Sequence, residues 1–146
     1  MDVLHQFLFH IVKLSKLVAS EVLENLEIAK LKDNDGWTLA HVAVISDELS
    51  AFKSLSNPKI AKLKDNEGWT LAHVAVISDE LSAFKSLSNP EIAKLENKYG
   101  QTVAHVAIIN NRSVARKVLK SPDTFGKIMD NSGISLLQLA AKTMTP

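Results

Sequence analysis

A segment of 32 residues occurs twice in succession in this chain, and it constrains the fold more than any other feature. Residues 33–64 read DNDGWTLAHVAVISDELSAFKSLSNPKIAKLK, and residues 65–96 repeat them with three substitutions, Asp35/Glu67, Lys59/Glu91 and Lys64/Glu96. A looser copy begins at residue 97, and a partial copy closes the chain from residue 130. Repetition at a period of about 20–50 residues is typical of a protein built from stacked structural units.

The first part of each copy has the pattern of a turn followed by a buried helix. Asp33, Asn34 and Asp35 with Gly36 predict a turn, because Asp and Asn bond their own backbone and Gly adopts a positive φ at little cost. Thr38 stands where a helix N-cap belongs. The next residues, LAHVAVI, are apolar except for one His, and a helix that is apolar on almost every side is expected to be buried on several sides.

The second part of each copy predicts a shorter amphipathic helix and a connector. Asp47 is expected to cap this helix, and the pair Asn57-Pro58 is expected to end it, because the residue before a proline disfavours helical backbone. Residues 59–64 then form either an extended segment or one short helical turn. The apolar face expected to pack inward against the neighbouring copies consists of Leu49, Phe52 and Leu55.

Taken together, these positions resemble those of the ankyrin repeat, whose pattern is D-x-x-G-x-T-x-x-H-x-A at a period of about 33 residues. The resemblance covers essentially the whole chain. It implies stacked helix pairs whose hairpin tips and inner helices form a concave recognition surface. The matching residues are Asp33, Gly36, Thr38, His41 and Ala43, then Asp65, Gly68, Thr70, His73 and Ala75, then Gly100, Thr102, His105 and Ala107, with Asn97 in place of the third Asp.

The chain also departs from the family pattern at three places in each copy. The family's proline after the threonine is absent, as are the glycine between the helices and the glycine of the connector. These changes leave the stacking positions intact and bear on the geometry of the projecting hairpin. The residues found instead are Leu39, Leu71 and Val103; Asp47, Asp79 and Asn111; and Asn57-Pro58, Asn89-Pro90 and Ser121-Pro122.

The predicted fold class is therefore all-α, an ankyrin-like helical repeat solenoid of about nine helices with N- and C-terminal capping elements. The 146 residues are expected to form a single repeat domain. Its parts are an N-terminal capping repeat (1–32), three full repeats (33–64, 65–96 and 97–129) and a C-terminal capping half-repeat (130–146).

The turn positions that vary between copies are the predicted recognition surface. Trp37 and Trp69 are followed in register by Gln101, and Trp is among the residues most enriched in binding hot spots. The alternative is that each Trp packs across the neighbouring turn and completes the local core. The residues predicted to contact a partner are Asn34, Asp35, Trp37, Asn66, Glu67, Trp69, Lys98, Tyr99 and Gln101.

The recurring histidines, His41, His73 and His105, are expected to have a structural role. Ligands of one metal ion lie about 2 Å from it, whereas packed helices lie about 8–10 Å apart, so each ring is expected to bond a neighbouring turn. No Gly-flanked nucleophile motif is present, and the sequence predicts no enzyme, no cofactor and no metal. The other expected structural residues are the turn glycines Gly36, Gly68 and Gly100 and the caps Thr38, Thr70 and Thr102.

Composition limits the kind of partner. The net charge is +1, so no strong field attracts nucleic acid or an anionic membrane, and the lysines of the connector KIAKLK are interpreted as a solvated face. The chain has no cysteine, which excludes disulfides and thiolate metal sites. Residues 3–12 are apolar, but no basic residue precedes them as in a signal peptide. They are also too few to span a bilayer. We expect a cytoplasmic monomer that binds a protein partner.

The near-identity of the two central copies supports an alternative to an evolved binding protein. Natural repeats normally meet different parts of a partner and diverge, whereas these copies differ at three positions. The alternative is a structural or engineered repeat protein, or a freshly duplicated one, with no specific evolved ligand. Silent differences scattered between the two coding segments would argue for natural age.

Overall fold

In the computed structural model, which describes residues 3–122 and 128–145, the chain is all-helical. Twelve helices and no strand occur among these residues, which confirms the all-α class. Residues 123–127, within the predicted third repeat, lie outside the described residues. In chain order the helices are α1 (Val3–Leu14), α2 (Lys16–Val22), α3 (Leu26–Ala29), α4 (Leu39–Ser46), α5 (Glu48–Ser54), α6 (Pro58–Ala61), α7 (Leu71–Ser78), α8 (Glu80–Ser86), α9 (Pro90–Ala93), α10 (Val103–Asn110), α11 (Arg112–Lys120) and α13 (Leu136–Met144).

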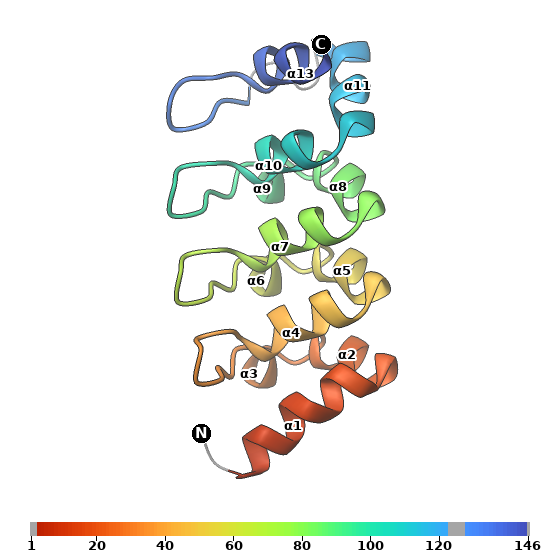
Figure 1. Cartoon of the computed structure of the whole chain (residues 1–146), viewed down its shortest axis with the longest axis vertical. Helices are drawn as coiled ribbons and strands as arrows, with labels where there is room; N and C mark the ends of the chain where they lie inside the picture. Colours follow the sequence, from red (N-terminus) through yellow and green to blue (C-terminus); the bar gives the residue numbers. More distant parts are fainter. Residues whose placement is uncertain (1–2, 123–127, 146) are drawn as a thin grey trace.

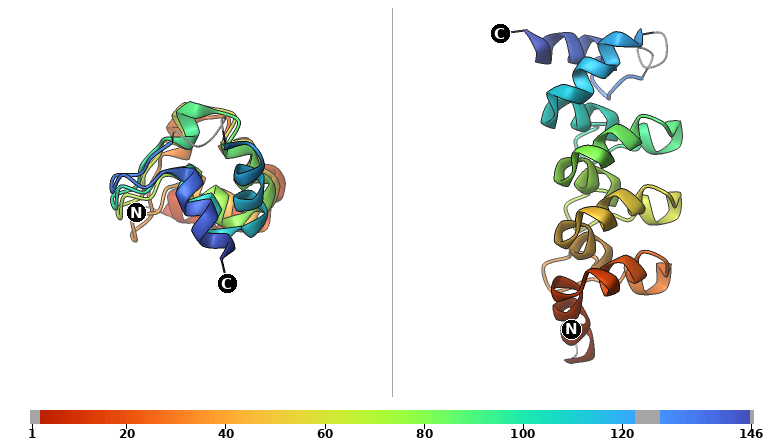
Figure 2. Two further views of the ribbon diagram at one scale, coloured as in Figure 1. Left: turned by 90° about the horizontal axis from the view of Figure 1, so that it is seen from above. Right: turned by 90° about the vertical axis from the view of Figure 1, so that its right-hand side faces the viewer.

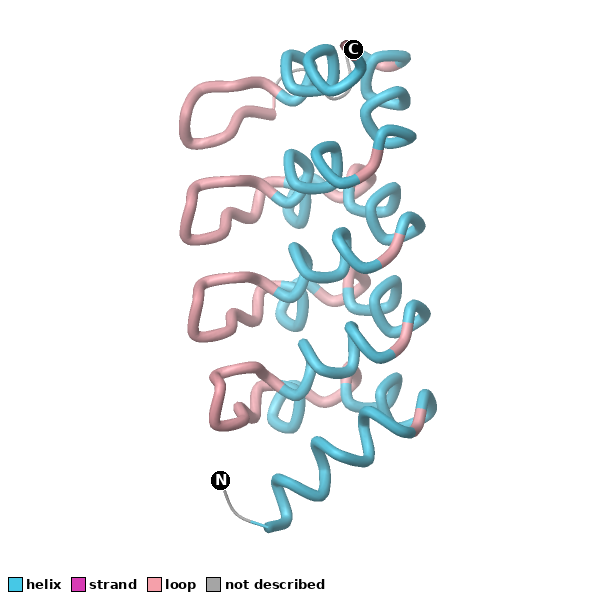
Figure 3. The backbone as a smooth tube through the Cα atoms, viewed as in Figure 1, coloured by secondary structure: helices cyan, strands magenta, loops and turns pink. Residues whose placement is uncertain are grey.

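The helices lie in successive layers along the long axis of the molecule (Figure 1). α4, α7 and α10 form an inner row in which each helix contacts the next, and α1 and α13 contact the two ends of this row. α2, α5 and α8 form an outer row beside it. Seen from above, the layers nearly superpose (Figure 2). The loops that precede α4, α7, α10 and α13 all project from one side (Figure 3).

The inner row carries most of the core. Residues 39–44 of α4 are all buried, and α7 and α10 bury the matching residues. Ala40 and Ala43 have no exposed surface, and such small side chains let neighbouring helices approach closely. Because α4 packs between α1 and α7 in the row and against α2 and α5 beside it, a helix that is apolar on almost every side is stable here.

The outer row packs with a different face from the one predicted. Leu49 is 73% exposed and Phe52 is 38% exposed, so the expectation that both are buried is wrong. α5 instead buries Ser50, Ala51 and Ser54. These side chains are short, and the two serine hydroxyls donate to acceptors within their own helix turn, at Asp47 Oδ2 and Ala51 O, so α5 can approach the inner row closely without leaving a polar group unsatisfied.

The connectors are short helices, which resolves the choice between an extended segment and a helical turn. α5 already ends at Ser54, and Asn57 is the N-cap of α6, with Pro58 at the first helical position. The expectation that Asn57-Pro58 ends the preceding helix is therefore wrong. Proline fits the first turn of a helix because the N–H it lacks has no partner there. The three connector helices α3, α6 and α9 account for the difference between twelve helices and the nine expected.

The projecting loops are hairpins with a common backbone. The Asp33 carboxylate accepts the N–H groups of Asp35 and Trp37, at 2.9 and 3.0 Å, and Gly36 has a φ of 86°. The next hairpin packs directly on this glycine, since Asn66 N–H donates to Gly36 O at 3.1 Å. Each hairpin is closed by an isolated antiparallel bridge; the bridges are Lys32–Thr38, Lys64–Thr70, Glu96–Thr102 and Met129–Ser135.

Candidate functional site

The structure brings the predicted recognition residues onto the row of hairpins, where they divide into tip residues and residues at the base of the hairpin. The tip residues are all exposed, and those at the base are half-buried. The tip residues are Asn34, Asp35, Asn66, Glu67, Lys98 and Tyr99, and the base residues are Trp37, Trp69 and Gln101.

The two tryptophans combine a packing role with an open surface. Trp37 lies edge-on to His41 with ring centroids 5.7 Å apart, and Trp69 lies edge-on to His73 at 6.0 Å. Trp69 also meets Tyr99 of the next hairpin, with centroids 6.0 Å apart. Part of each indole thus completes the local core, as the alternative interpretation expects, and the remaining surface faces solvent.

A groove runs between the hairpins and the inner helices, and it passes both tryptophans. One cavity of 290 Å³ is lined by Trp37, Ile45, Trp69 and Ile77, among others. A second cavity, of 360 Å³, shares Trp37 and Ile45 and extends toward Lys13 of α1. We call these two cavities the Trp groove. Its lining combines the apolar side chains of Trp37, Ile45, Trp69 and Ile77 with a few charged and polar ones.

Sequence reasoning missed the isoleucines at the ends of the inner helices, of which Ile45 and Ile77 line the Trp groove. Ile45, Ile77 and Ile109 end the apolar run of each inner helix, and they are 56%, 48% and 52% exposed. An apolar residue that remains half-exposed in three successive copies contributes little to the core. The signal was present in the sequence as an apolar position directly before the helix end at Ser46, Ser78 and Asn110.

Charge is distributed unevenly along the hairpins. The carboxylates of Asp33 and Asp65 are engaged by backbone N–H groups of their own hairpins, so they hold the loop rather than present a free charge. Asp35 and Glu67 lie exposed at the first two tips, whereas Lys98 lies at the third. The exposed charges at the hairpin tips are therefore acidic at the first two hairpins and basic at the third, and Lys13 adds a positive charge at the α1 end of the Trp groove.

Gln101 does not continue the tryptophan ladder as a free contact residue. Its side-chain Oε1 accepts from Asn97 Nδ2 at 3.1 Å, and its backbone N–H donates to Asn97 Oδ1 at 3.0 Å. Asn97 therefore takes the place of the Asp of the earlier copies, and Gln101 supports that hairpin. The exposed groups of the third hairpin are Lys98 and Tyr99, whose ammonium and ring lie 5.1 Å apart.

The histidines fix the hairpins that form this surface. His41 N–H donates to Thr38 Oγ1, which caps α4, and the Thr38 hydroxyl lies against His41 Nδ1. His41 Nε2 faces the backbone carbonyl of Trp69 at 3.1 Å. Because only a protonated Nε2 can donate to a carbonyl, Nδ1 is the acceptor of the hydroxyl hydrogen. His73 and His105 make the same three contacts, reaching the carbonyls of Gln101 and Ile134.

Burial favours the neutral form of His41 and His73. Desolvation lowers the pKa of His73 to about 4, against the opposing effect of its bond to the Gln101 carbonyl. Burial also lowers the pKa of His41, although the bond to Trp69 O and the charge of Asp65 oppose it. Both ring nitrogens of each His are engaged in hydrogen bonds, which is the arrangement of a structural crosslink between layers.

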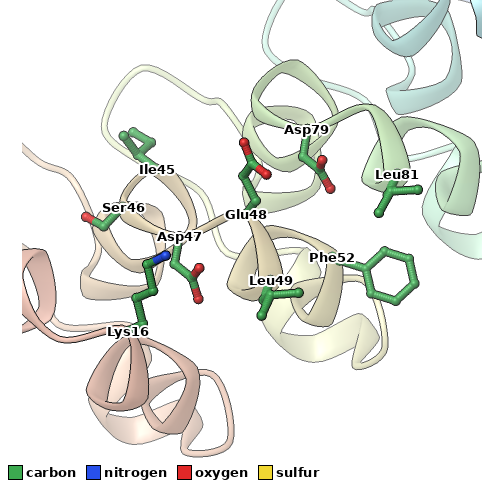
Figure 4. Close-up of a pocket in the computed structure, with 9 residues that line it drawn as sticks. All are labelled: Lys16, Ile45, Ser46, Asp47, Glu48, Leu49, Phe52, Asp79 and Leu81. Atoms are coloured by element: carbon green, nitrogen blue, oxygen red, sulfur yellow. The ribbon is translucent and has the colours of Figure 1, made fainter.

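A further cavity lies away from the hairpins, where α4 turns into α5 (Figure 4). It measures 620 Å³, and its lining includes Lys16, the carboxylates of Asp47, Glu48 and Asp79, and the apolar side chains of Ile45, Leu49, Phe52 and Leu81. Asp47 and Asp79 begin α5 and α8 and accept from serine hydroxyls of those helices. The sequence did not reveal this cleft, because Leu49 and Phe52 were expected to face inward.

Three further observations concern the described residues. Over 3–122 and 128–145, no group of three or more His, Asp or Glu side chains is placed to hold a metal ion. Every buried polar side-chain atom in the same part of the chain has a hydrogen-bond partner. None of the described helices has the length and apolar character needed to cross a membrane.

Comparison with models of known protein families and with curated protein sequences finds no match to the chain.

Proposed function

We propose that this chain is a non-enzymatic protein–protein interaction scaffold of the ankyrin type, a helical repeat solenoid with a capping element at each end. Its partner binds along the hairpin tips and the Trp groove. The residues that carry the ankyrin resemblance have matching structural roles, which supports the assignment: Asp33 holds the hairpin, Thr38 caps the inner helix, and His41 joins one layer to the next.

The observation that carries the function is the pair of half-exposed indoles, Trp37 and Trp69, over one apolar groove. Large aromatic side chains that line a pocket and are surrounded by polar groups are the usual anchors of a binding interface. Isolated apolar residues on a surface have no such meaning, whereas here Ile45 and Ile77 lie in the same groove. An extended or helical segment with apolar side chains fits this floor.

The acidic rim narrows the chemistry of the partner. Asp35 and Glu67 flank the groove, and a segment that carries Lys or Arg beside its apolar residues complements them. Lys98 at the third hairpin favours a neutral or acidic end of the same segment. The partner therefore lies with its basic part over the first two hairpins.

Selection from a displayed library of random peptides on the immobilised chain tests this proposal. The affinity of the selected peptides is then measured by calorimetry for Trp37→Ala, Trp69→Ala and, as a control, Leu81→Ala, whose parent side chain is exposed but outside the Trp groove. We expect both Trp variants to lose at least about 10-fold in affinity, since buried hot-spot residues contribute about 2 kcal/mol or more. Peptides whose affinity is unchanged in both Trp variants would overturn the proposal.

The second candidate is a structural or engineered repeat with no evolved ligand, and the near-identity of residues 33–64 and 65–96 favours it. Identical copies present identical side chains, so a partner would meet the same chemistry twice. The same selection can be run in parallel on the wild type and on the Trp37→Ala/Trp69→Ala variant. If every peptide that binds the wild type also binds the variant, this second candidate is preferred.

A further inference from the structure

Helix α1 has two apolar faces, and the rest of the chain covers one of them. Phe9 and Val12 are 5% and 1% exposed and pack toward α4. Leu4, Phe7 and Leu14 are 72%, 61% and 71% exposed, although they are as apolar as the buried pair. α1 lies at one end of the row of inner helices, and none of the other described helices lies on its outer side (Figure 1).

The uncovered residues have the spacing of a helix–helix seam. Leu4, Phe7, Ile11 and Leu14 follow one another at intervals of three, four and three residues, which are the a and d positions of a heptad. Ile11 is half-buried, and Val3, which is 80% exposed, lies beside this stripe. We call these five residues the α1 stripe. No charged side chain belongs to it, so covering it removes no charge from water.

The two ends of the stack differ in character. The exposed residues of α13 are Gln138, Ala141 and Lys142, none of which is a large apolar side chain. Such a surface is expected of the terminal element of a stacked protein, because nothing packs on it. Placing the α1 stripe of one copy against α13 of another would bury apolar groups against polar ones. A second α1 stripe, which is apolar throughout, matches the α1 stripe better than α13 does.

We propose that the α1 stripe is a homodimer interface in which two copies pair their α1 helices antiparallel about a two-fold axis. This register places Leu4 opposite Leu14 of the other copy, and Phe7 opposite Ile11 of the other copy. Each contact then occurs twice, as a two-fold interface requires. The pairing closes on itself and forms no filament. The proposed dimer differs from the monomer expected from the sequence.

The area of the α1 stripe suits such a dimer. Five side chains at roughly 60–120 Å² of apolar surface each amount to several hundred Å² per copy. A standard interface buries about 800 Å² per partner, of which somewhat more than half is apolar. None of the five residues lines the Trp groove, so the dimer leaves both grooves open, and the proposal does not depend on the function proposed above.

Sedimentation equilibrium over a range of concentrations tests the dimer. One chain has a mass of 16.0 kDa, and we expect the wild type to reach twice that mass. The variant Phe7→Glu/Leu14→Glu is expected to raise the dimer dissociation constant at least 10-fold with unchanged helical circular dichroism, because both side chains are exposed in one chain. The control Leu49→Glu/Leu81→Glu changes two equally exposed leucines away from α1 and is expected to remain dimeric.

Two results would overturn the proposal. One is a wild-type chain that stays monomeric at high concentration, which would leave the α1 stripe to a different protein. The other is a control variant that dissociates as readily as the α1 variant, which would place the interface elsewhere.

Cysteine crosslinking tests the register, and the chain contains no cysteine of its own. Leu4→Cys protein mixed with Leu14→Cys protein is expected to form a disulfide-linked pair under mild oxidation. Leu4→Cys alone is expected to link poorly. In the antiparallel register its two copies lie about 15 Å apart along the helices, which exceeds the reach of a disulfide. Efficient linking of Leu4→Cys to itself would contradict the antiparallel pairing.

Discussion

His73 Nε2 donates to the backbone carbonyl of Gln101 across 2.8 Å, and this bond joins the α7 layer to the hairpin of the α10 layer. The backbone N–H of His73 donates to Thr70 Oγ1, which caps α7. In the last layer Gln138 occupies the matching position, and its amide oxygen accepts the N–H of Ser135 to close a capping box. The three histidines therefore bond to the hairpin of the next layer, whereas Gln138 bonds within its own helix turn.

Replacing His73 with leucine is expected to destabilise the chain by about 1–3 kcal/mol, because it removes both hydrogen bonds of a buried ring, to Gln101 O and to the Thr70 hydroxyl. The Gln101 carbonyl then keeps only the Asn97 N–H, and Thr70 Oγ1 keeps only the backbone N–H of residue 73. Urea unfolding followed by circular dichroism measures the change. The control Gln138→Leu changes the matching exposed position of α13, whose side chain bonds only within its own helix turn. It loses the capping-box bond to Ser135 N–H and should cost less, about 0.5–1 kcal/mol. Equal losses in the two variants would show that the interlayer bond has no special role.

Acid is expected to weaken the fold through the same residue. The pKa of His73 is about 4 in the folded chain and 6.5 in the unfolded one, so the unfolded state binds more protons between these values. Stability contributed by His73 is complete above about pH 6.5 and is lost as the pH falls toward 4, by about 3 kcal/mol in total. The lowered pKa of His41 acts in the same direction.

Urea midpoints of the wild type and His73→Leu at pH 7.5, 5.5 and 4.5 measure this effect. The variant lacks the titrating ring, so the wild type should lose more stability over this range. Carboxylates titrate equally in both proteins and cancel in the comparison. Identical pH slopes would contradict a buried neutral His73.

Two glycines with the same backbone conformation allow steric contact to be separated from backbone strain. Gly36 and Gly133 have φ values of 86° and 80°. A Cβ at Gly36 would lie 2.1 Å from Asn66 Nδ2, whereas nothing lies within 4 Å at Gly133. We expect Gly133→Ala to cost about 1 kcal/mol from strain alone, and Gly36→Ala to cost clearly more because the stacked hairpin must move. Thermal unfolding of both variants checks this, and a similar cost in the two would mean that the hairpins do not pack closely.

Local features of this fold could be predicted because their causes are local. The hairpin glycine, the Thr38 cap and the Asp33 turn each depend on residues within five positions of one another, and the all-α class followed from them. The inward face of α5 could not be predicted, because it depends on how closely two helices approach. Ser50 and Ala51 permit that approach, whereas Leu49 does not.

The candidate site could be predicted only where its features have local causes. The exposed tip residues, such as Asp35 and Glu67, followed from the turn pattern. Ile45 was missed because it ends an apolar run that is otherwise buried, and its exposure depends on how the neighbouring layers pack. The exposed face of α1 could also be predicted only in part. Helical spacing shows that Phe7 and Leu14 share a face, whereas only the arrangement of the described helices shows that none of them covers it.

Methyl and indole NMR of the chain with a selected peptide is the most direct test of the Trp groove as the recognition surface. We predict that the largest shift changes occur at the methyl groups of Ile45 and Ile77 and at the indole N–H groups of Trp37 and Trp69. The leucines of the outer row, Leu17, Leu49 and Leu81, are expected to remain unchanged. Shift changes confined to those leucines, with Ile45, Ile77 and both indoles unaffected, would contradict the proposed binding surface.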